Sequence, residues 1–458
     1  MLYEIKHTMK KLFFYIITII TLLTVAGGKG ICQSVMTMTT ESRAWQAKIG
    51  LAGSGIAMID WGDGESDTLE ISEALSYRKH LYSDKLTRTI TVNGKGIKVM
   101  DCSNNLLIML DISKNTLLTE LYCYNNELIS LNLNKNTALI ELHCTSNKLT
   151  SLDISKNTAL MRLHCGSNKL TNLDVRKNTV LTELGCSHNQ ITNLDISKNI
   201  TLTVLWCNGN QLMDVDVSKN TTLKKINCSE NQLTNLDVSK NTTLIELYCS
   251  KNPLKNLDVS NNLILMELGC RENQLTSLNV KNNIVLTKLL CNGNQLTNLD
   301  ISNNPVLKML WCYHNPLKNL DISKNTALTE LNCNHNQLTS LNINENTELI
   351  ELNCSYNQLV SLDMSKNRLL KKINCSHNQL VKLDATQNTG LNTFNCNANN
   401  LSAIALNTLF YTLNKKFYQS ITGRIYIYEN IGTDTCDKSI AEEKGWWVIV
   451  EKGEDEIY

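Results

Sequence analysis

The sequence predicts a mainly β solenoid of about 15 coils, nearly straight, with a small N-terminal β-sandwich-like module and a C-terminal helix and strand cap. Three observations lead to this fold class. A cysteine recurs every 21 residues from Cys102 to Cys396. Leucine-type residues lie five and two positions before each cysteine, and five, eight and ten positions after it. Asparagines occupy the third and thirteenth positions after it in two unbroken columns. A fixed period of this length is typical of coils that bury their apolar faces by stacking on one another.

The first 33 residues differ in character from the rest of the chain. Lys10 and Lys11 precede an apolar run over residues 12–26, which small residues follow. This order is typical of a secretory signal peptide, and the run is shorter than the roughly 20 residues that a membrane helix needs. An uncleaved anchor, or a lipid attached to Cys32, are the alternatives. We therefore expect an exported protein, extracellular, at the cell surface or periplasmic, with no membrane span after signal removal.

Residues 34–96 are expected to form a small β module that caps the first coil. The alternation in "TRTITVNG" and the Asp-Gly and Asn-Gly turn pairs are typical of short strands and hairpins. The stretch "IDWGDG", with His80 and Tyr82 further on, is similar to PKD-like β-sandwich modules. Asp60 and Asp63 could bind calcium, but a tight hairpin uses the same residues, and we favour the turn.

Each coil of residues 97–400 is expected to contain a short strand around its cysteine. Leu121 and Cys123 are two positions apart and share a face, whereas Tyr122 points the other way. The coil has no room for an amphipathic helix. Its second half repeats the motif L-x-x-L-x-apolar-x-x-N, so we expect a second extended segment opposite the first. If both sides stack at the strand spacing of about 4.8 Å, the solenoid is a nearly straight rod about 70 Å long.

The cysteines and asparagines are expected to hold the coils together from inside. Unoxidised cysteine behaves as a small hydrophobic residue, and parallel in-register side chains do not suit the torsion of about 90° in a disulfide. The chain has no C-x-x-C pair, which a metal site would favour. We therefore favour buried, reduced cysteines over disulfides or metal ligands. An amide side chain at each corner can pair with inward backbone N–H and C=O groups, which explains the asparagine columns.

Residues 401–458 are expected to close the last coil. The stretch "LSAIALNTLFYTLNKKF" has apolar residues at helical spacing, "GRIYIYEN" is typical of a strand, and "CDKSIAEEKGWWVIV" of a short helix and a strand. An open end would expose apolar surface and unpaired strand edges. Cys436, alone in this segment, is expected to be packed rather than reactive.

The motif L-x-x-L-x-C-x-x-N-x-L resembles the leucine-rich repeat signature, with cysteine in place of the third leucine. The fuller pattern LxxLxCxxNxLxxLDVSxNT is similar to the 21-residue repeats of secreted and surface bacterial leucine-rich repeat proteins, and the C-terminal segment is similar to their cap. The back of the coil departs from the commoner members, which place a helix there. The resemblance implies a non-enzymatic binding module.

Composition and motifs argue against other functions. The chain of 458 residues has a formal net charge of +1, so nucleic acid is a poor candidate partner. It contains no G-x-S-x-G, no H-E-x-x-H, no P-loop and no dinucleotide fingerprint. We expect no catalytic residues, no cofactor and no metal site.

The candidate binding residues are those that the repeat leaves free. Aromatic rings and six of the eight histidines gather at the outward positions just before each cysteine, just after it, and one further on. Exposed rings on a rigid sheet provide contact area at low entropic cost, although they could also merely cover the sheet. The partner-binding residues we predict are Tyr122, Tyr124, His143, His164, His188, Trp206, Tyr248, Trp311, Tyr313, His314, His335, Tyr356 and His377. Because histidine titrates near pH 6.5, we expect binding to depend on pH.

A second column on the opposite side of the coil holds aspartate or asparagine at the ninth position after each cysteine. Lysines often follow three positions later. We interpret these as solvated ion-pair rows, because the glycine-rich nonapeptide of calcium-binding rolls is missing.

These patterns favour an exported module that recognises a protein or peptide through the exposed face of the cysteine-bearing strand. One alternative is a structural or adhesive surface spacer whose N-terminal module contacts the ligand. The other is glycan binding through Trp206 and Trp311. Deleting residues 34–96 is expected to separate the first two hypotheses.

Overall fold

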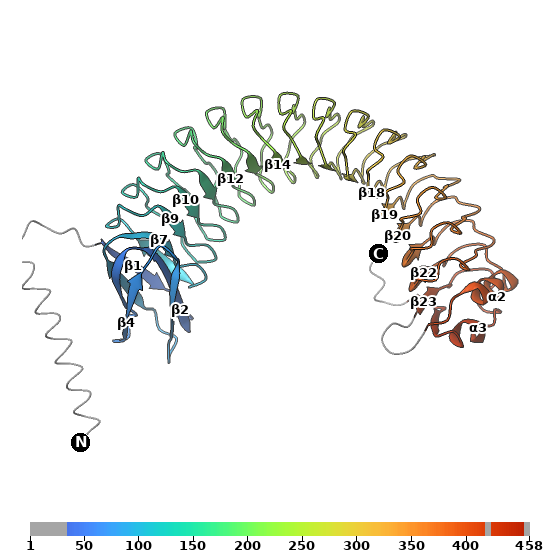
Figure 1. Ribbon diagram of the computed structural model, residues 1–458, viewed down its shortest axis with the longest axis horizontal. Coiled ribbons are helices and arrows are strands. Elements are labelled where there is room, and N and C mark those ends of the chain that lie inside the picture. The colour runs from blue at the N-terminus through green and yellow to red at the C-terminus, as the bar shows by residue number, and fades with distance from the viewer. Residues whose placement is uncertain (1–33, 417–422, 453–458) are drawn as a thin grey trace, which may run out of the picture.

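The computed structural model describes residues 34–416 and 423–452. The predicted signal peptide and Cys32 lie outside the described residues. The described chain is a mainly β solenoid with an N-terminal β module and a C-terminal cap, which confirms the predicted fold class (Figure 1). Within these ranges, no helix is both long enough and apolar enough to cross a membrane.

The front of each coil is a three-residue strand that ends just before the cysteine. Leu121 pairs with Leu142 and the strands stack in parallel without a shift of register. The Cys123 N–H also donates to the carbonyl of His143 at 2.8 Å, which extends the pairing beyond the strand. The strands are β9 (Glu120–Tyr122), β10 (Glu141–His143), β11 (Arg162–His164), β12 (Glu183–Gly185), β13 (Val204–Trp206), β14 (Lys225–Asn227), β15 (Glu246–Tyr248), β16 (Glu267–Gly269), β17 (Lys288–Leu290), β18 (Met309–Trp311), β19 (Glu330–Asn332), β20 (Glu351–Asn353), β21 (Lys372–Asn374) and β22 (Thr393–Asn395).

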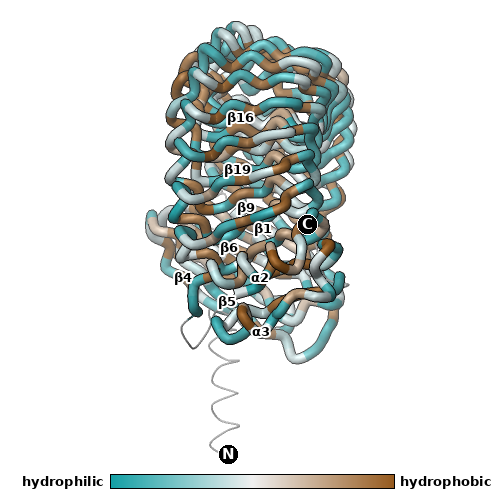
Figure 2. Tube along the Cα trace, turned by 90° about the vertical axis from the view of Figure 1, so that its right-hand side faces the viewer, coloured by the Kyte–Doolittle hydropathy of each residue, from teal (hydrophilic) through white to brown (hydrophobic). Residues whose placement is uncertain are grey.

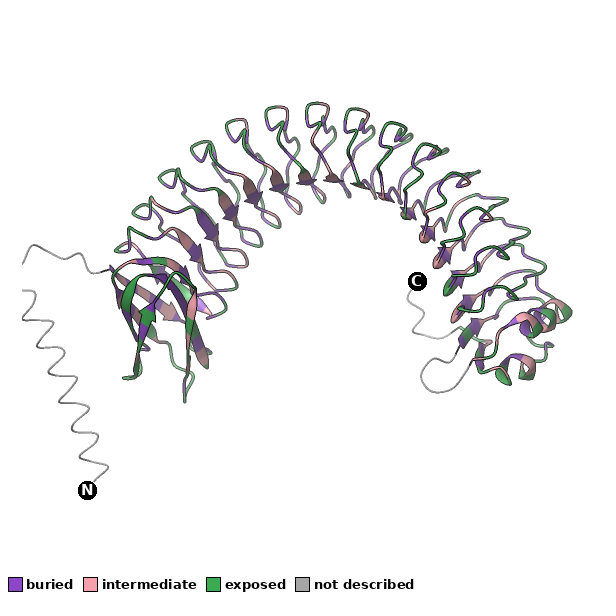
Figure 3. Cartoon of the chain, viewed as in Figure 1, coloured by how far each residue is buried: buried purple, intermediate pink, exposed green. Residues whose placement is uncertain are grey.

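Apolar columns fill the interior of the coils, as the leucine spacing predicts. In one coil Leu118, Leu121, Cys123, Leu128 and Leu133 are each at most 1% exposed. Each buried leucine contributes roughly 1.5–3 kcal/mol relative to an exposed one. Apolar and polar segments alternate along every coil in Figure 2, and buried residues line the inside of the stack in Figure 3.

The two asparagine columns form the two corners of the coil, but they pair differently. At the front corner, Asn126 Nδ2 donates to the carbonyls of Cys102 and Cys123 at 3.0 Å, and its Oδ1 accepts from the Leu107 N–H. At the back corner, Asn136 Nδ2 donates to the Asn115 carbonyl at 2.8 Å, whereas its Oδ1 is buried without a partner. Each amide therefore ties two coils together, as expected, but only the front corner uses both donor and acceptor.

The back of the coils forms no continuous ladder beyond the first coil of the described chain, and the solenoid is strongly curved, so the expectation of a nearly straight rod is wrong. Backbone hydrogen bonds between coils cover the front and its corners, as from Ile140 to Thr119 and from Lys148 to Leu128. Beyond the first coil, the one back-to-back bridge in the described chain joins Asp258 to Asn279. Without a backbone ladder the coils spread apart at the back, and the strands come to lie on the concave side of an arc (Figure 1).

The N-terminal module shares both of its sheets with the first coil. One sheet has the strand order β4-β3-β6-β1-β8, and β8 is the back of that coil. In the other, β2 pairs with β5 and β7, and β7 pairs in parallel with β9 of the solenoid. The strands are β1 (Ser34–Thr40), β2 (Gln46–Gly53), β3 (Gly55–Asp60), β4 (Ser66–Ile71), β5 (Ser76–Leu81), β6 (Thr89–Gly94), β7 (Ile97–Asp101) and β8 (Leu107–Asp111). The concave sheet therefore begins inside the module.

The C-terminal cap continues the concave sheet. Helix α2 (Ala403–Thr412) follows the last repeat, and Ser402 caps its N-terminus through a hydrogen bond from the Ala405 N–H. Strand β23 (Gly423–Tyr426) pairs in parallel with β22, and β24 (Trp446–Ile449) pairs with β23. The short helix α3 (Ser439–Glu442) precedes β24. Helix, strand, short helix and strand thus follow in the predicted order.

Candidate binding surface

A single row of residues crosses the concave sheet from the N-terminal module to the cap. Strand register places Tyr77 opposite Gly50, Gly50 opposite Asp101, and Asp101 opposite Tyr122. The row then passes through the residue that directly precedes each cysteine. We call the part of this row from Tyr77 to Trp311 the concave row. Sequence reasoning missed Tyr77, because the register of an antiparallel pair between the module and the solenoid is not visible in the repeat.

Four rings of the concave row touch one another along the sheet. The ring centroids of Tyr122 and His143 are 5.1 Å apart, and those of His143 and His164 are 4.3 Å apart. The Trp206 ring reaches His164 at 5.8 Å across the intervening Gly185. A Cβ at Gly185 would lie 2.8 Å from His164 Nδ1, so the missing side chain leaves the room that this ring occupies.

Two further rings lie over glycines of the neighbouring strand. Tyr248 covers Gly269, where an added Cβ would lie 2.5 Å from the ring. Tyr77 covers Gly50 in the same way, also at 2.5 Å, and its hydroxyl donates to Asp101 at 2.8 Å. Glycine therefore recurs beside rings of the row. Its missing side chain leaves the room that the rings of Tyr77, His164 and Tyr248 occupy.

Glutamates of the next coil hold these rings in place. The Tyr122 hydroxyl donates to Glu141 at 3.1 Å, and Trp311 Nε1 donates to Glu330 at 2.6 Å. Both glutamates lie 19 residues beyond their ring, at the third position before the next cysteine. The same offset joins two further pairs, Tyr248 with Glu267 and His164 with Glu183. Sequence reasoning missed these glutamates, although their recurrence at this offset is a signal that it could have used.

Glu141 is the most buried of these carboxylates, with a side chain 8% exposed. It accepts hydrogen bonds from His143 Nε2 at 2.8 Å and from Arg162 Nε at 2.6 Å. Burial by itself would raise the pKa of Glu141, but the hydrogen bonds from Arg162 and Tyr122 lower it overall. The same surroundings raise the pKa of Tyr122 through burial and its hydrogen bond to Glu120. The ring is therefore held as a neutral donor against a charged carboxylate.

The predicted site residues do not form one face. Tyr122, His143, His164, Trp206, Tyr248 and Trp311 belong to the concave row. The two residues directly after a cysteine are Tyr124 and Tyr313. His188, His314, His335, Tyr356 and His377 occupy the next position, where the backbone turns with positive φ. The structure thus separates a surface on the sheet from a surface on the turn that follows it.

The turn position carries its own stack of rings in the C-terminal half. The ring centroids of His314 and His335 are 4.2 Å apart, those of His335 and Tyr356 are 4.1 Å apart, and those of Tyr356 and His377 are 4.0 Å apart. We call these four residues the turn ladder. Tyr313 connects it to the concave row, with its ring 5.6 Å from His314 and 6.3 Å from Trp311.

Several solved structures of bacterial repeat proteins share this fold. The functional domain of InlJ from Listeria monocytogenes, which includes a cysteine ladder, is 33% identical over 75% of this chain and 77% of that one, with a TM-score of 0.59. The chain belongs to the leucine-rich repeat proteins. The protein LIC12759 of Leptospira interrogans, 23% identical over 76% of this chain and 94% of its own, has a TM-score of 0.66. The internalin InlF of Listeria monocytogenes, 19% identical over 64% of this chain and 85% of its own, has a TM-score of 0.55. No family model and no curated protein matches the sequence.

The cysteines of this leucine-rich repeat protein are buried and free, as predicted. The column from Cys102 to Cys396 lies inside the concave sheet, and no disulfide forms among the described cysteines. Burial raises the pKa of Cys144 to about 12, so the thiol stays protonated at neutral pH. Cys436 is also buried in the cap. The ladder is thus part of the hydrophobic core.

The aspartate column on the convex side of the repeats caps turns, a role that the expectation of ion-pair rows did not include. Asp111 Oδ1 accepts from the Ser113 N–H at 2.9 Å, and Asn132 Oδ1 accepts from the Asn134 N–H at 3.1 Å. Two of these aspartates also form ion pairs, Asp174 with Arg176 and Asp300 with Lys281. The pKa of Asp111 is lowered by its hydrogen bonds from Ser113 and, through longer-range attraction, by Lys114 three positions later. The backbone contact explains why aspartate and asparagine alternate in this column, because both side chains can cap a turn.

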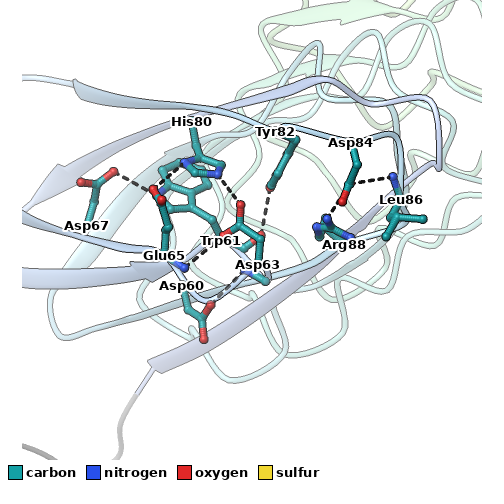
Figure 4. Close-up of polar contacts among 11 residues, drawn as sticks. Asp60, Trp61, Asp63, Glu65, Asp67, His80, Tyr82, Asp84, Leu86 and Arg88 are labelled. Atoms are coloured by element: carbon teal, nitrogen blue, oxygen red, sulfur yellow. Dashed lines mark hydrogen bonds and ion pairs between the residues drawn. The ribbon is translucent and has the colours of Figure 1, made fainter. Parts of the chain in front are cut away.

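A separate polar cluster in the N-terminal module closes the "WGDG" turn (Figure 4). Asp60 Oδ1 accepts from Gly62 N–H at 2.9 Å, and Asp63 Oδ1 accepts from Glu65 N–H at 3.1 Å. His80 Nε2 lies 2.7 Å from Asp63 Oδ2, and its ring stacks on Trp61. Across residues 34–416 and 423–452, no group of three or more potential ligands is placed to hold a metal ion. The predicted turn is confirmed.

Proposed function

We propose that this leucine-rich repeat protein is an exported, non-enzymatic module that recognises a protein or peptide partner through the concave row. The observation that carries the proposal is the row of seven rings between Tyr77 and Trp311 on one face of the sheet, several of which are held by a carboxylate or lie over a glycine. Rings that are already ordered lose little conformational entropy when a partner binds. Tyrosine and tryptophan are also the side chains enriched among the residues that dominate binding energy.

The fold supports the same class of function. Bacterial leucine-rich repeat proteins, among them internalins, share this solenoid, and their scaffolds are built for protein interaction rather than catalysis. Three parts of the proposal rest on the sequence alone. These are export, a signal peptide over residues 1–33, and the division of the chain into a module (34–96), a solenoid (97–400) and a cap (401–458). So does the likeness of the N-terminal segment to PKD-like modules.

The continuity of the concave sheet changes how the proposal must be tested. Because β2 pairs with β7, deleting residues 34–96 would unpair the first strand of the sheet and remove Tyr77 from the row. Loss of binding after that deletion would not separate a site on the module from a site on the repeats. Substitutions of single rings keep the sheet intact and are the better test.

The test uses the full chain as bait in the medium or surface extract of its native environment. The double variant Trp206→Ala/Trp311→Ala removes two rings of the concave row. Its matched control, Met213→Ala/Val360→Ala, removes two exposed apolar side chains outside the concave row. We expect the first variant to lose at least about tenfold in affinity for the captured partner, since each hot-spot ring contributes about 2 kcal/mol or more. Equal capture of the partner by both variants would contradict the proposal. If the double variant loses the capture of glycans only, the partner is a carbohydrate rather than a protein.

A further inference from the structure

The concave sheet ends, on the side of the N-terminal module, at strand β5. This strand pairs with β2 on one side, and no strand of the described residues pairs with it on the other. An open strand edge presents backbone N–H and C=O groups to which another extended chain can add. The edge of β5 therefore has the chemistry of a docking site for polypeptide backbone.

The register of the sheet shows which backbone groups of β5 face this edge. In an antiparallel pair, residues alternate between bonding the partner strand and directing both backbone groups to the other side. Lys48 of β2 directs its groups away from β5, because its N–H donates to Asn105 Oδ1 at 2.7 Å and its C=O accepts from Asn105 Nδ2 at 2.8 Å. Lys79 lies opposite Lys48. The N–H and C=O groups of Lys79, and of Tyr77 and Leu81 on either side of it, therefore point to the open edge.

These backbone groups are almost unused within the protein. Across residues 34–416 and 423–452, the one hydrogen bond to them joins the Arg78 guanidinium to the Tyr77 carbonyl at 3.1 Å. The three residues are exposed, whereas the inner face of β5 is held by His80, whose ring stacks on Trp61 (Figure 4). The edge is thus open to a partner and already ordered, so little conformational entropy is lost when a partner binds.

The module has a second open edge, at strand β4, and the two edges differ in character. The Trp61 N–H donates to the Glu65 carbonyl at 3.1 Å, and the same alternation then decides which residues of β4 face outward. Those residues are Ser66, Thr68 and Glu70, all polar. At β5, by contrast, Leu81 is 60% exposed and Tyr77 39% exposed. Polar side chains protect an edge from other strands, and the edge of β5 has this protection only at its centre.

The centre of the β5 edge is positively charged. Among the described residues, Lys48, Arg78 and Lys79 form no ion pair. Lys79 Nζ lies 5.8 Å from the Trp45 ring, and Lys48 Nζ lies 4.0 Å from the Tyr77 ring. Side chains directly opposite one another on neighbouring strands share a face and interact. A segment that fits this edge therefore has a carboxylate opposite Lys79 and apolar side chains two positions to either side.

We propose that β5 is a docking edge, to which a partner protein adds an extended segment with an apolar–x–acidic–x–apolar pattern. The segment continues the concave sheet as an antiparallel strand, which is slightly more stable per residue than a parallel one. Its backbone bonds those of Tyr77, Lys79 and Leu81, and its side chains set the register. The site consists of backbone groups of the module rather than the rings of the solenoid, so the proposal does not depend on the function proposed above.

The test uses a fluorescent heptapeptide in which valine, glutamate and valine alternate with threonines, and its binding to the full chain is measured by anisotropy. Two methylated forms follow. In an antiparallel pair the N–H groups of the valines and the glutamate face β5, whereas those of the threonines face away. We expect N-methylation of the first three residues to weaken binding at least about tenfold, and N-methylation of three threonines to weaken it less than about threefold.

A pair of protein variants tests the same contact from the other side. Lys79→Pro removes an N–H that faces the open edge, where proline is tolerated in a strand, so the fold should persist. Peptide binding should fall at least about tenfold. The matched control, Lys79→Thr, keeps the N–H and removes only the charge, so it should lose less than about fivefold. The melting temperatures of both variants check the fold.

Three outcomes would overturn the proposal: no binding of the unmodified peptide, equal binding of the two methylated peptides, or equal losses in Lys79→Pro and Lys79→Thr. The methylated peptides are measured on the unaltered protein, so they decide the question if Lys79→Pro does not fold. Trp206→Ala/Trp311→Ala should bind the peptide normally, which separates a failure at this edge from a failure at the concave row. Loss of the peptide in that variant would place it on the concave row instead and would also overturn the proposal.

Discussion

The front and back halves of each coil carry the same nine-residue pattern, L-x-x-L-x-apolar-x-x-N, yet beyond the first coil only the front half forms a strand in the described chain. The residue before the apolar position differs between the two halves, but it does not by itself account for the difference. On the front it is a ring or a neutral side chain, and the backbone pairs with neighbouring coils. On the back it is aspartate or asparagine, whose side chain takes the N–H two residues later. The same cap is made on the front by Asn227 and Asn332, which lie in strands, so the continuous backbone pairing of the front rather than this position distinguishes the two sides.

The largest contrast is expected between the two asparagine corners. Asn231→Ala at the front removes the acceptor of the Leu212 N–H and leaves that donor buried and unpaired. Asn241→Ala at the back removes only donors, and it also removes an Oδ1 that has no partner. An unpaired buried donor costs about 1–3 kcal/mol. We expect the front variant to lose about 3 kcal/mol of unfolding free energy and the back variant about 1 kcal/mol, measured by urea titration. Equal losses would mean that the two corners are equivalent.

A second contrast concerns the room inside each half of the coil. Cys249 and Val259 are both fully buried, the first under the paired strands and the second on the unpaired back. Leucine at either position adds volume. Strand pairing fixes the spacing at the front, so we expect Cys249→Leu to cost about 1–3 kcal/mol by overpacking. Val259→Leu should cost less than about 1 kcal/mol, because the coils can move apart at the back. Urea titration of both variants gives the comparison, and a greater cost at Val259 would contradict it.

Sequence periodicity predicts the interior of this protein well, because burial repeats with the chain. The cysteine, leucine and asparagine columns, and the elements of the C-terminal cap, are found where their spacing places them. Curvature was predicted wrongly, because the same motif was assumed to give the same backbone. The role of the aspartates at Asp111 and its equivalents could have been inferred from the serine or asparagine that often follows two positions later.

The candidate site was predicted only in part, for a different reason. Outward positions are visible in the repeat, but which of them share a surface depends on where the strand ends and the turn begins. His143 and His335 differ by three positions within their coils, and this difference puts one on the sheet and the other in a left-handed turn. Tyr77 joins the row from a strand of the N-terminal module, so it is recognised only once the register is known.

A smaller effect is expected from acid on the back of the coils. Hydrogen bonds from Ser302 lower the pKa of Asp300 to about 2. A carboxylate with a lowered pKa stabilises the fold above its unfolded value of about 3.9 and loses this effect as the pH falls through the folded pKa. Acid unfolding between pH 4 and pH 2 should therefore be less steep in Asp300→Asn, which keeps the cap as Asn132 does. Asn227→Asp, on the concave row, is the control variant. If wild type and Asp300→Asn unfold identically between pH 4 and pH 2, the Asp300 cap has no role in acid stability.

The smallest expected effect tests the origin of curvature itself. If the capping side chains keep the back of the coils from pairing, replacing them by a β-branched residue should let a ladder form there. The one existing bridge, between Asp258 and Asn279, marks the place where the coils are already close enough. We expect Asp237→Thr/Asp258→Thr/Asn279→Thr to flatten this part of the arc, since threonine favours extended backbone and offers no carboxylate to cap a turn. Small-angle X-ray scattering should then record a slightly larger maximum dimension than in the wild type. If the maximum dimension is unchanged while circular dichroism shows an intact fold, the missing ladder is not the cause of the curvature. The curvature would then come from the width of the back half of each coil.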